Sequence, residues 1–217
     1  MGKGSVFERS VATQLSLWYS HGTDDSWIWR TAMSGGRSTV RSRKGKRTSG
    51  GAGDLTFTDE RAAPLFDLIT FELKRGYPKV SLSDLIDRND GTKPAGFELW
   101  VQQAKASARQ GHTPYWMIIH KRNNRPAMAY MNRNLFAKLK VETDLGKAAP
   151  YVYWYGGVRD GDKASSATIP QGIVGVQFDQ FLDLVNPCFL GAAPCPSGKK
   201  SSTSSKPGRS TSTRSGS

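Results

Sequence analysis

Residues 67–74, DLITFELK, constrain the fold more than any other segment, because polar and apolar side chains alternate along them. Successive side chains of an extended strand point to opposite faces, so the apolar residues at positions 69, 71 and 73 would share one face. Such a strand needs neighbouring strands and an apolar layer to cover this face. Glu72 and Lys74 fall together on the other face, which brings a carboxylate and an ammonium group side by side.

The rest of the chain predicts an α/β fold. Apolar residues at helical spacing predict helices over residues 5–20 and 97–110, with Ser5 and Glu8 as a capping box and Gly111 as a C-cap. Further β-prone stretches are 27–31, 54–58, 115–121, 127–131, 151–155 and 172–178. Short helices are expected over 132–140 and 179–185, and one helical turn near 82–86. We therefore expect a mixed central β-sheet flanked by helices.

Charge restricts the class of partner. The 217 residues carry 31 Lys and Arg against 18 Asp and Glu, a formal net charge of +13, which favours a polyanion such as nucleic acid. No apolar run approaches the roughly 18–20 residues that span a bilayer, and no phosphate-binding Gly-x-x-x-x-Gly-Lys segment is present, so neither a membrane nor a nucleotide cofactor is expected. The two cysteines are too few for a disulfide framework and favour a reducing, cytoplasmic setting.

The basic residues are concentrated in two segments. Residues 34–52 are glycine-rich and contain no acidic residue, so we expect a mobile loop that either grips DNA phosphates or is simply solvated. Its cations, the predicted DNA-binding residues, are Arg37, Arg41, Arg43, Lys44, Lys46 and Arg47. Residues 188–217 end in a Ser/Thr-rich basic stretch and are expected to be a disordered tail. One domain over residues 1–187 is therefore predicted.

A candidate metal site follows from Asp54. It comes directly after Gly53 and opens a short strand, so it would lie beside Glu72 if this strand pairs with residues 67–74. Two carboxylates suit Mg²⁺, which takes oxygen ligands and fills its remaining positions with water and substrate phosphate. Lys74 would then orient or help to deprotonate an attacking water molecule. The alternatives are a turn role for Asp54 and an ordinary charge pair between Glu72 and Lys74.

These residues resemble the signature of the PD-(D/E)XK nucleases, the restriction-endonuclease-like superfamily. Asp54 and the tripeptide Glu72-Leu73-Lys74 stand in its two signature strands, Glu8 falls where its first helix carries an acid, and Gln103 falls in the following helix. The resemblance covers about residues 5–121 and is nearest to Holliday-junction-resolvase-like and virus-encoded members. The chain departs from the pattern at Gly53, where the superfamily name has Pro.

The resemblance implies a restriction-endonuclease-like core and a Mg²⁺-dependent DNA endonuclease, with Mn²⁺ able to substitute. It implies catalytic roles for Glu8, Asp54, Glu72, Lys74 and Gln103. Asp54, Glu72 and the carbonyl of Leu73 would bind the metal, with Glu8 as a further ligand. We expect a homodimer that is selective for DNA structure and acts on branched DNA. If the protein is virus-encoded, it would act in the host cytoplasm. The alternatives are a restriction- or repair-type duplex endonuclease and a non-catalytic DNA-binding accessory protein.

Two further groups of residues remain open to interpretation. The aromatic stretch at residues 151–155 would serve either as a base-stacking platform or, as we favour, in packing against the sheet. His21, His112 and His120 show no metal-ligand spacing and are interpreted as structural.

Overall fold

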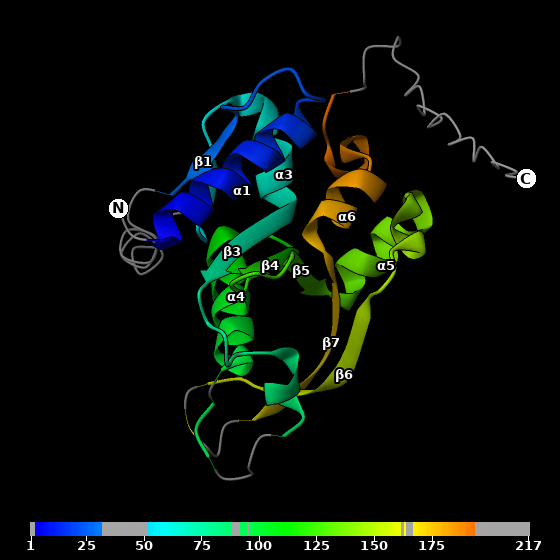
Figure 1. The fold of residues 1–217 in the computed structure, drawn as a ribbon. Coiled ribbons are helices and arrows are strands. Elements are labelled where there is room, and N and C mark those ends of the chain that lie inside the picture. Colours follow the sequence, from blue (N-terminus) through cyan, green and yellow to red (C-terminus); the bar gives the residue numbers. More distant parts are fainter. Residues whose placement is uncertain are drawn as a thin grey trace, which may run out of the picture.

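The computed structural model of the chain describes residues 3–31, 52–87, 92–94, 96–161, 163 and 167–193 (Figure 1). The cations of the predicted DNA-binding loop, residues 37–47, lie outside these ranges, as does the tail from residue 194 onward. Among the described residues no helix is long and apolar enough to cross a membrane.

Helices and strands alternate along the chain. The helices are α1 (Lys3–Tyr19), α3 (Ala63–Leu68), α4 (Phe97–Gly111), α5 (Arg133–Glu142) and α6 (Phe178–Leu184). The strands are β1 (Ile28–Arg30), β2 (Leu55–Phe57), β3 (Ile69–Arg75), β4 (Tyr115–Lys121), β5 (Ala127–Asn132), β6 (Val152–Arg159) and β7 (Thr168–Gln177). Short 3-10 helices are η1 (Glu60–Ala62), η2 (Leu82–Leu85), η3 (Asp144–Lys147) and η4 (Pro187–Leu190).

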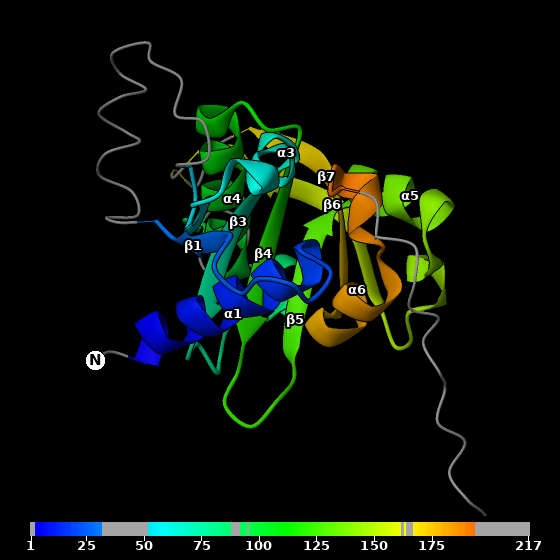
Figure 2. The same cartoon turned by 90° about the horizontal axis from the view of Figure 1, so that it is seen from above.

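Five strands form the central sheet in the order β3-β4-β5-β7-β6. β3 and β4 are parallel and the other neighbours are antiparallel, so the predicted mixed sheet is confirmed. Figures 1 and 2 show α4 on one face of this sheet and α1 with α6 on the other. β3, the strand that bears Glu72 and Lys74, is an edge strand.

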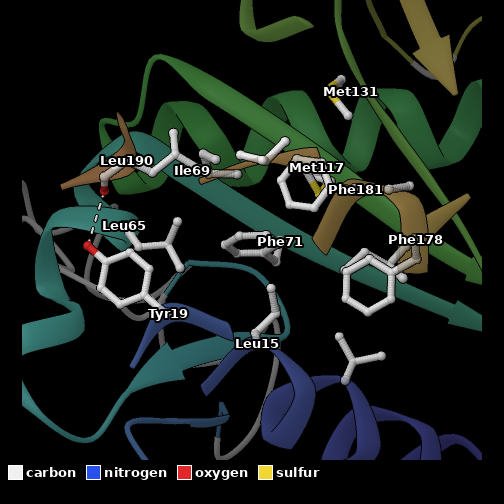
Figure 3. Packing of buried hydrophobic residues seen from close by; sticks show 14 of the residues in the cluster. Leu15, Tyr19, Leu65, Ile69, Phe71, Met117, Met131, Phe178, Phe181 and Leu190 are labelled. Carbon is white, nitrogen blue, oxygen red and sulfur yellow. Dashed lines mark hydrogen bonds between the residues drawn. The ribbon is translucent and has the colours of Figure 1, made fainter. Parts of the chain in front are cut away.

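Each face of the sheet has its own hydrophobic core. The larger core packs α1 and α6 against the apolar face of β3, and Figure 3 shows Leu15, Phe71 and Phe178 meeting in it. The smaller core lies under α4 and joins Phe97 to Trp154 of β6. Because both faces are covered, β3 is buried along nearly its whole length.

A buried ion pair fixes where α4 lies across the sheet. Glu98, in the first turn of α4, accepts hydrogen bonds from the backbone N–H and the guanidinium of Arg159 at the end of β6. One helical turn later, Gln102 Nε2 donates to the carbonyl oxygens of Arg159 and Gly161, each at 2.8 Å. These contacts anchor the N-terminal half of α4 to the end of β6, and the helix also packs on β3 and β4.

Several expectations about elements were wrong in detail. Asp67 and Leu68 belong to α3 and not to the strand. β2 pairs with β1 and not with β3, so the aspartate reaches β3 without joining the central sheet. Helix α1 begins by Lys3, which places Ser5 inside the helix and removes the predicted capping box.

Three further differences concern the end of α4, the segment after residue 187 and the aromatic stretch. The left-handed residue after α4 is His112, with φ 55°, and not Gly111, which is the last helical residue. Glycine suits position 111 for a different reason, because a Cβ there would lie 2.9 Å from that of Ala52. The described structure continues past residue 187 into η4, where Leu190 is buried and its carbonyl accepts from Tyr19 Oη at 3.1 Å (Figure 3). In residues 151–155 only Trp154 is buried, and the three tyrosines are exposed.

Candidate active site

Glu72 and Lys74 lie on the face of β3 that α4 covers. Their residues are only 1 % and 9 % exposed. Removing a charged group from water is costly unless other groups pair with it, so both side chains need partners inside the protein. The strand's alternation supplies the first pair, because it aims both groups into the same space between β3 and α4.

A hydrogen-bonded network satisfies both charges. Lys74 Nζ donates to Glu72 Oε2 at 3.1 Å and to Gln103 Oε1 at 2.9 Å. The other carboxylate oxygen, Glu72 Oε1, accepts from Ser107 Oγ at 2.7 Å. Gln103 and Ser107 are one helical turn apart on α4, so a single helix face holds both ends of the ion pair.

Asp54 is fixed to the outer edge of β3 at two points. Its backbone N–H donates to the carbonyl of Phe71 at 2.8 Å, and its Oδ2 accepts from the backbone N–H of Leu73 at 2.7 Å. The N–H and C=O of one strand residue point to the same side, so the Leu73 carbonyl shares this edge with Asp54. Both signature segments therefore meet here although β2 and β3 do not pair as strands.

Gly53 explains the departure from the superfamily pattern. Its φ is +87°, a region that proline cannot enter because its ring holds φ near −65°. A Cβ at this position would overlap the carbonyl oxygen of Phe71 and lie 2.9 Å from Thr70 Cγ2. Glycine is thus required twice, for its backbone angle and for the close approach that brings Asp54 against β3.

The electrostatics of the site favour a bound cation. Burial raises the pKa of the Glu72 carboxyl, and the nearby negative charge of Asp54 raises it further. A divalent ion between the two carboxylates would relieve this repulsion. The described residues contain no group of three His, Cys, Asp or Glu side chains suited to a metal, but two carboxylates fit Mg²⁺, which completes its shell with water and phosphate oxygens.

Glu8 stands apart from the other predicted site residues. Its Oε2 lies 3.7 Å from Arg30 Nη1, a surface ion pair in which the Glu8 side chain is 30 % exposed. Arg30 ends β1, and the next residue, Thr31, donates its backbone N–H to the Asp54 carbonyl. Glu8 is thus linked to the Asp54 segment through Arg30 and Thr31, while the network around Glu72 is built from Lys74, Gln103 and Ser107.

The sequence interpretation missed Ser107 as a site residue and took His120, which also lies near the site, as structural. Ser107 is four residues after Gln103, a helical spacing that points to it once α4 is known to cover β3. His120 is the register partner of Lys74 on β4, is 3 % exposed and packs edge-on against Trp100. Burial lowers the pKa of His120 to about 4, so the ring beside the lysine is neutral at neutral pH.

A family model described as "Phage putative PDDEXK endonuclease" matches residues 1–163, three quarters of the chain. Its span includes every residue of the network around Glu72 and Lys74. No curated protein and no solved structure matches the chain.

Proposed function

Because the chain belongs to the family of phage PDDEXK endonucleases, we propose that it hydrolyses phosphodiester bonds of DNA with the help of a divalent metal ion. The observation that carries the proposal is the convergence of Asp54, Glu72 and Lys74 at one end of β3. We assign the activity to a single domain of residues 1–193, followed by the basic tail.

Each side chain has a distinct role in this proposal. Asp54, Glu72 and the Leu73 carbonyl would hold Mg²⁺ or Mn²⁺, with Glu8 as an outer ligand. The ion supplies positive charge that acidifies water and neutralises charge developing on the phosphate. Lys74 would orient the attacking water, and its hydrogen bond to Glu72 would hold that carboxylate in place. Gln103 would position Lys74, a role supported by the 2.9 Å hydrogen bond between them. Most of the catalysis is positioning and electrostatics.

Asp54→Asn tests this proposal without disturbing the fold. The substitution is nearly isosteric and removes a charge that raises the pKa of Glu72, so we expect unchanged or slightly higher stability. Cleavage with Mg²⁺ should fall by about 10³-fold, the usual cost of losing one electrostatic catalytic group. Lys74→Ala should lose cleavage as well, but it leaves Glu72 buried without its ion-pair partner and is expected to melt earlier. Full activity in both variants would overturn the proposal.

We further propose that the substrate is branched DNA, met in the cytoplasm of a phage-infected host. A Mg²⁺ cleavage assay on a four-way junction, a linear duplex and a single strand separates the possibilities. Paired nicks confined to the junction support the resolvase-like reading, and equal cutting of the duplex supports a restriction- or repair-type enzyme. Binding of DNA with no cutting of any substrate would support the non-catalytic accessory protein.

We also propose that two copies associate through β6. This strand forms the second edge of the sheet, and residues 152–158 carry no charge. Tyr153 and Tyr155 on it are 49 % and 61 % exposed. An uncharged, exposed edge strand is a template for antiparallel pairing with a second copy. Tyr153→Lys with Tyr155→Lys should give a monomer in sedimentation, and a wild-type protein that sediments as a monomer would contradict the proposal.

A further inference from the structure

A basic pocket lies on the opposite face of β3 from the candidate active site. Helices α1 and α6 touch where Trp18 packs against Phe181 and leave a cavity of about 280 Å³ nearer the beginning of α1. Figures 1 and 2 show the two helices side by side on this face of the sheet. The cavity is lined by α1, by the ends of β3 and β4, and by the start of α6.

Two cations reach into this pocket from adjacent strands. Arg75 ends β3 and Lys121 ends β4, and the two residues are partners in the parallel register, so their side chains share one face. The Arg75 guanidinium carbon lies 5.7 Å from the centre of the Phe7 ring, which holds it against α1. Like charges at neighbouring positions repel one another unless an anion lies between them.

The remaining lining suits an anion with hydrogen-bond acceptors. Ser10 and Gln14 of α1 line the pocket with polar groups, and Asp179 of α6 contributes the single negative charge against two positive ones. Arg75 Nε is buried and has no hydrogen-bond partner among the described residues. A buried donor without an acceptor is costly, and a phosphate in the cavity would give the Arg75 guanidinium an acceptor.

The position of Arg75 identifies the anion. Lys74 and Arg75 are consecutive residues of an edge strand, so one reaches the active-site face and the other the pocket face of the same strand end. A DNA strand whose reacting phosphate lies at Lys74 can place a neighbouring phosphate at Arg75 by passing the end of β3. We propose that this pocket is a subsite for a phosphate of the DNA substrate, held by Arg75 and Lys121, a proposal that rests on the proposed nuclease function.

Salt-dependent binding tests the subsite separately from catalysis. In the cleavage-deficient Asp54→Asn protein, without Mg²⁺, binding of a labelled DNA is measured by fluorescence anisotropy over a range of salt concentrations. Neutralising both cations with Arg75→Gln and Lys121→Gln should reduce the slope of log K against log salt by about 1, since the two cations hold one phosphate and each phosphate contact contributes about 0.9. The matched control is Lys138→Gln with Lys140→Gln on α5, which Figure 1 shows on the far side of the molecule.

The control should leave the slope nearly unchanged, because α5 lies away from the DNA path. Equal slopes in the pocket and control variants would overturn the subsite, whatever the outcome of the cleavage assays. Ser10→Glu offers a second test from an exposed position of α1 and should weaken binding by placing a negative charge at the pocket. Unchanged binding by a folded Ser10→Glu protein would also count against the proposal.

A neutral methylphosphonate then distinguishes a local contact from general attraction. The methylphosphonate replaces one DNA phosphate at a time near the cut. For the protein with an intact pocket, binding should weaken at one or two of these DNA positions. The same substitution should have no effect in the Arg75→Gln, Lys121→Gln variant. Equal sensitivity in both proteins would show that the phosphate contacts lie elsewhere.

Discussion

Lys74 is held between two acceptors that come from different elements. Glu72 Oε2 belongs to its own strand, and Gln103 Oε1 belongs to α4. The neighbouring glutamine, Gln102, points away and binds two carbonyls at the edge of the sheet. One helix therefore uses adjacent, chemically identical residues for different purposes, one for orienting the lysine and the other for anchoring the helix.

Replacing each of these two glutamines by alanine separates the two roles. Gln103→Ala should reduce cleavage by about 10-fold or more, the effect of losing one hydrogen bond to a charged group, with little change in stability because the residue is exposed. Gln102→Ala should lower the free energy of unfolding by about 1–2 kcal/mol and leave cleavage near the wild-type rate. Cleavage rates and urea unfolding of both variants check this, and the reverse pattern would refute it.

His120 makes stability depend on pH. Burial lowers the pKa of His120 to about 4 from an ordinary 6.5. Between pH 4 and 6.5 the imidazole is therefore protonated in the unfolded chain but neutral in the folded protein. Its contribution to stability is complete above pH 6.5 and should fall by about 1.4 kcal/mol per pH unit between 6.5 and 4. The raised pKa of Glu72 acts in the opposite direction, so the quantity to measure is a difference between two proteins.

His120→Leu provides that difference. Leucine fills a similar space against Trp100 and removes a ring whose Nε2 has no hydrogen-bond partner among the described residues. The stability of the wild type relative to this variant should decline from pH 6.5 to 4.5, by up to about 3 kcal/mol. Parallel stability curves for the two proteins over this range would rule out a titrating role.

At the scale of elements, the approach of β2 to β3 depends on Gly53. Gly53→Ala should lower the free energy of unfolding by about 2 kcal/mol or more and reduce cleavage, since strain and overlap would move Asp54 away from β3. Gly22→Ala is the matched control, because its φ is +80° but a Cβ there meets nothing within 4 Å. Urea unfolding and cleavage assays should show a stability loss of about 1 kcal/mol and normal activity for Gly22→Ala. Normal activity of Gly53→Ala would contradict this account.

Local patterns predicted most of the elements but not how they meet. The alternation in residues 67–74 and the apolar run at 115–121 identified β3 and β4, since side-chain periodicity is a local property. The pairing of β2 with β1 is not local, and nothing in either short strand specifies its partner. Helix α3 was missed although Pro64 stands in its first turn, a signal that the sequence does contain.

The candidate site was predictable to the same extent. Asp54, Glu72, Lys74 and Gln103 follow from the superfamily pattern, and the structure brings all four together. To predict that Ser107 and His120 lie near the site, one must know that α4 packs over β3 and how β3 is in register with β4. Only the tertiary structure provides both. The same holds for the pocket of Arg75 and Lys121, whose strands are separated by about forty residues.

At the scale of the whole molecule, two basic segments carry much of the net charge of +13. If the six cations of residues 37–47 each meet a phosphate, neutralising all six should reduce the slope of log K against log salt by about 5. Neutralising the five cations of the tail, Lys199, Lys200, Lys206, Arg209 and Arg214, removes nearly the same charge and should reduce the slope much less. Equal reductions in the two variants would show that only total charge matters.

The central claim is that the carboxylates at the edge of β3 support metal-dependent hydrolysis of DNA. The most direct test is nicking of a supercoiled plasmid by the wild-type protein with Mg²⁺, then with the metal removed by EDTA, and again after Mg²⁺ is restored, with Asp54→Asn in parallel. We predict nicking by the wild type only when Mg²⁺ is present, full recovery on restoring it, and at most about 10⁻³ of this rate for Asp54→Asn. Nicking that persists in EDTA, or that Asp54→Asn performs equally well, would contradict the account.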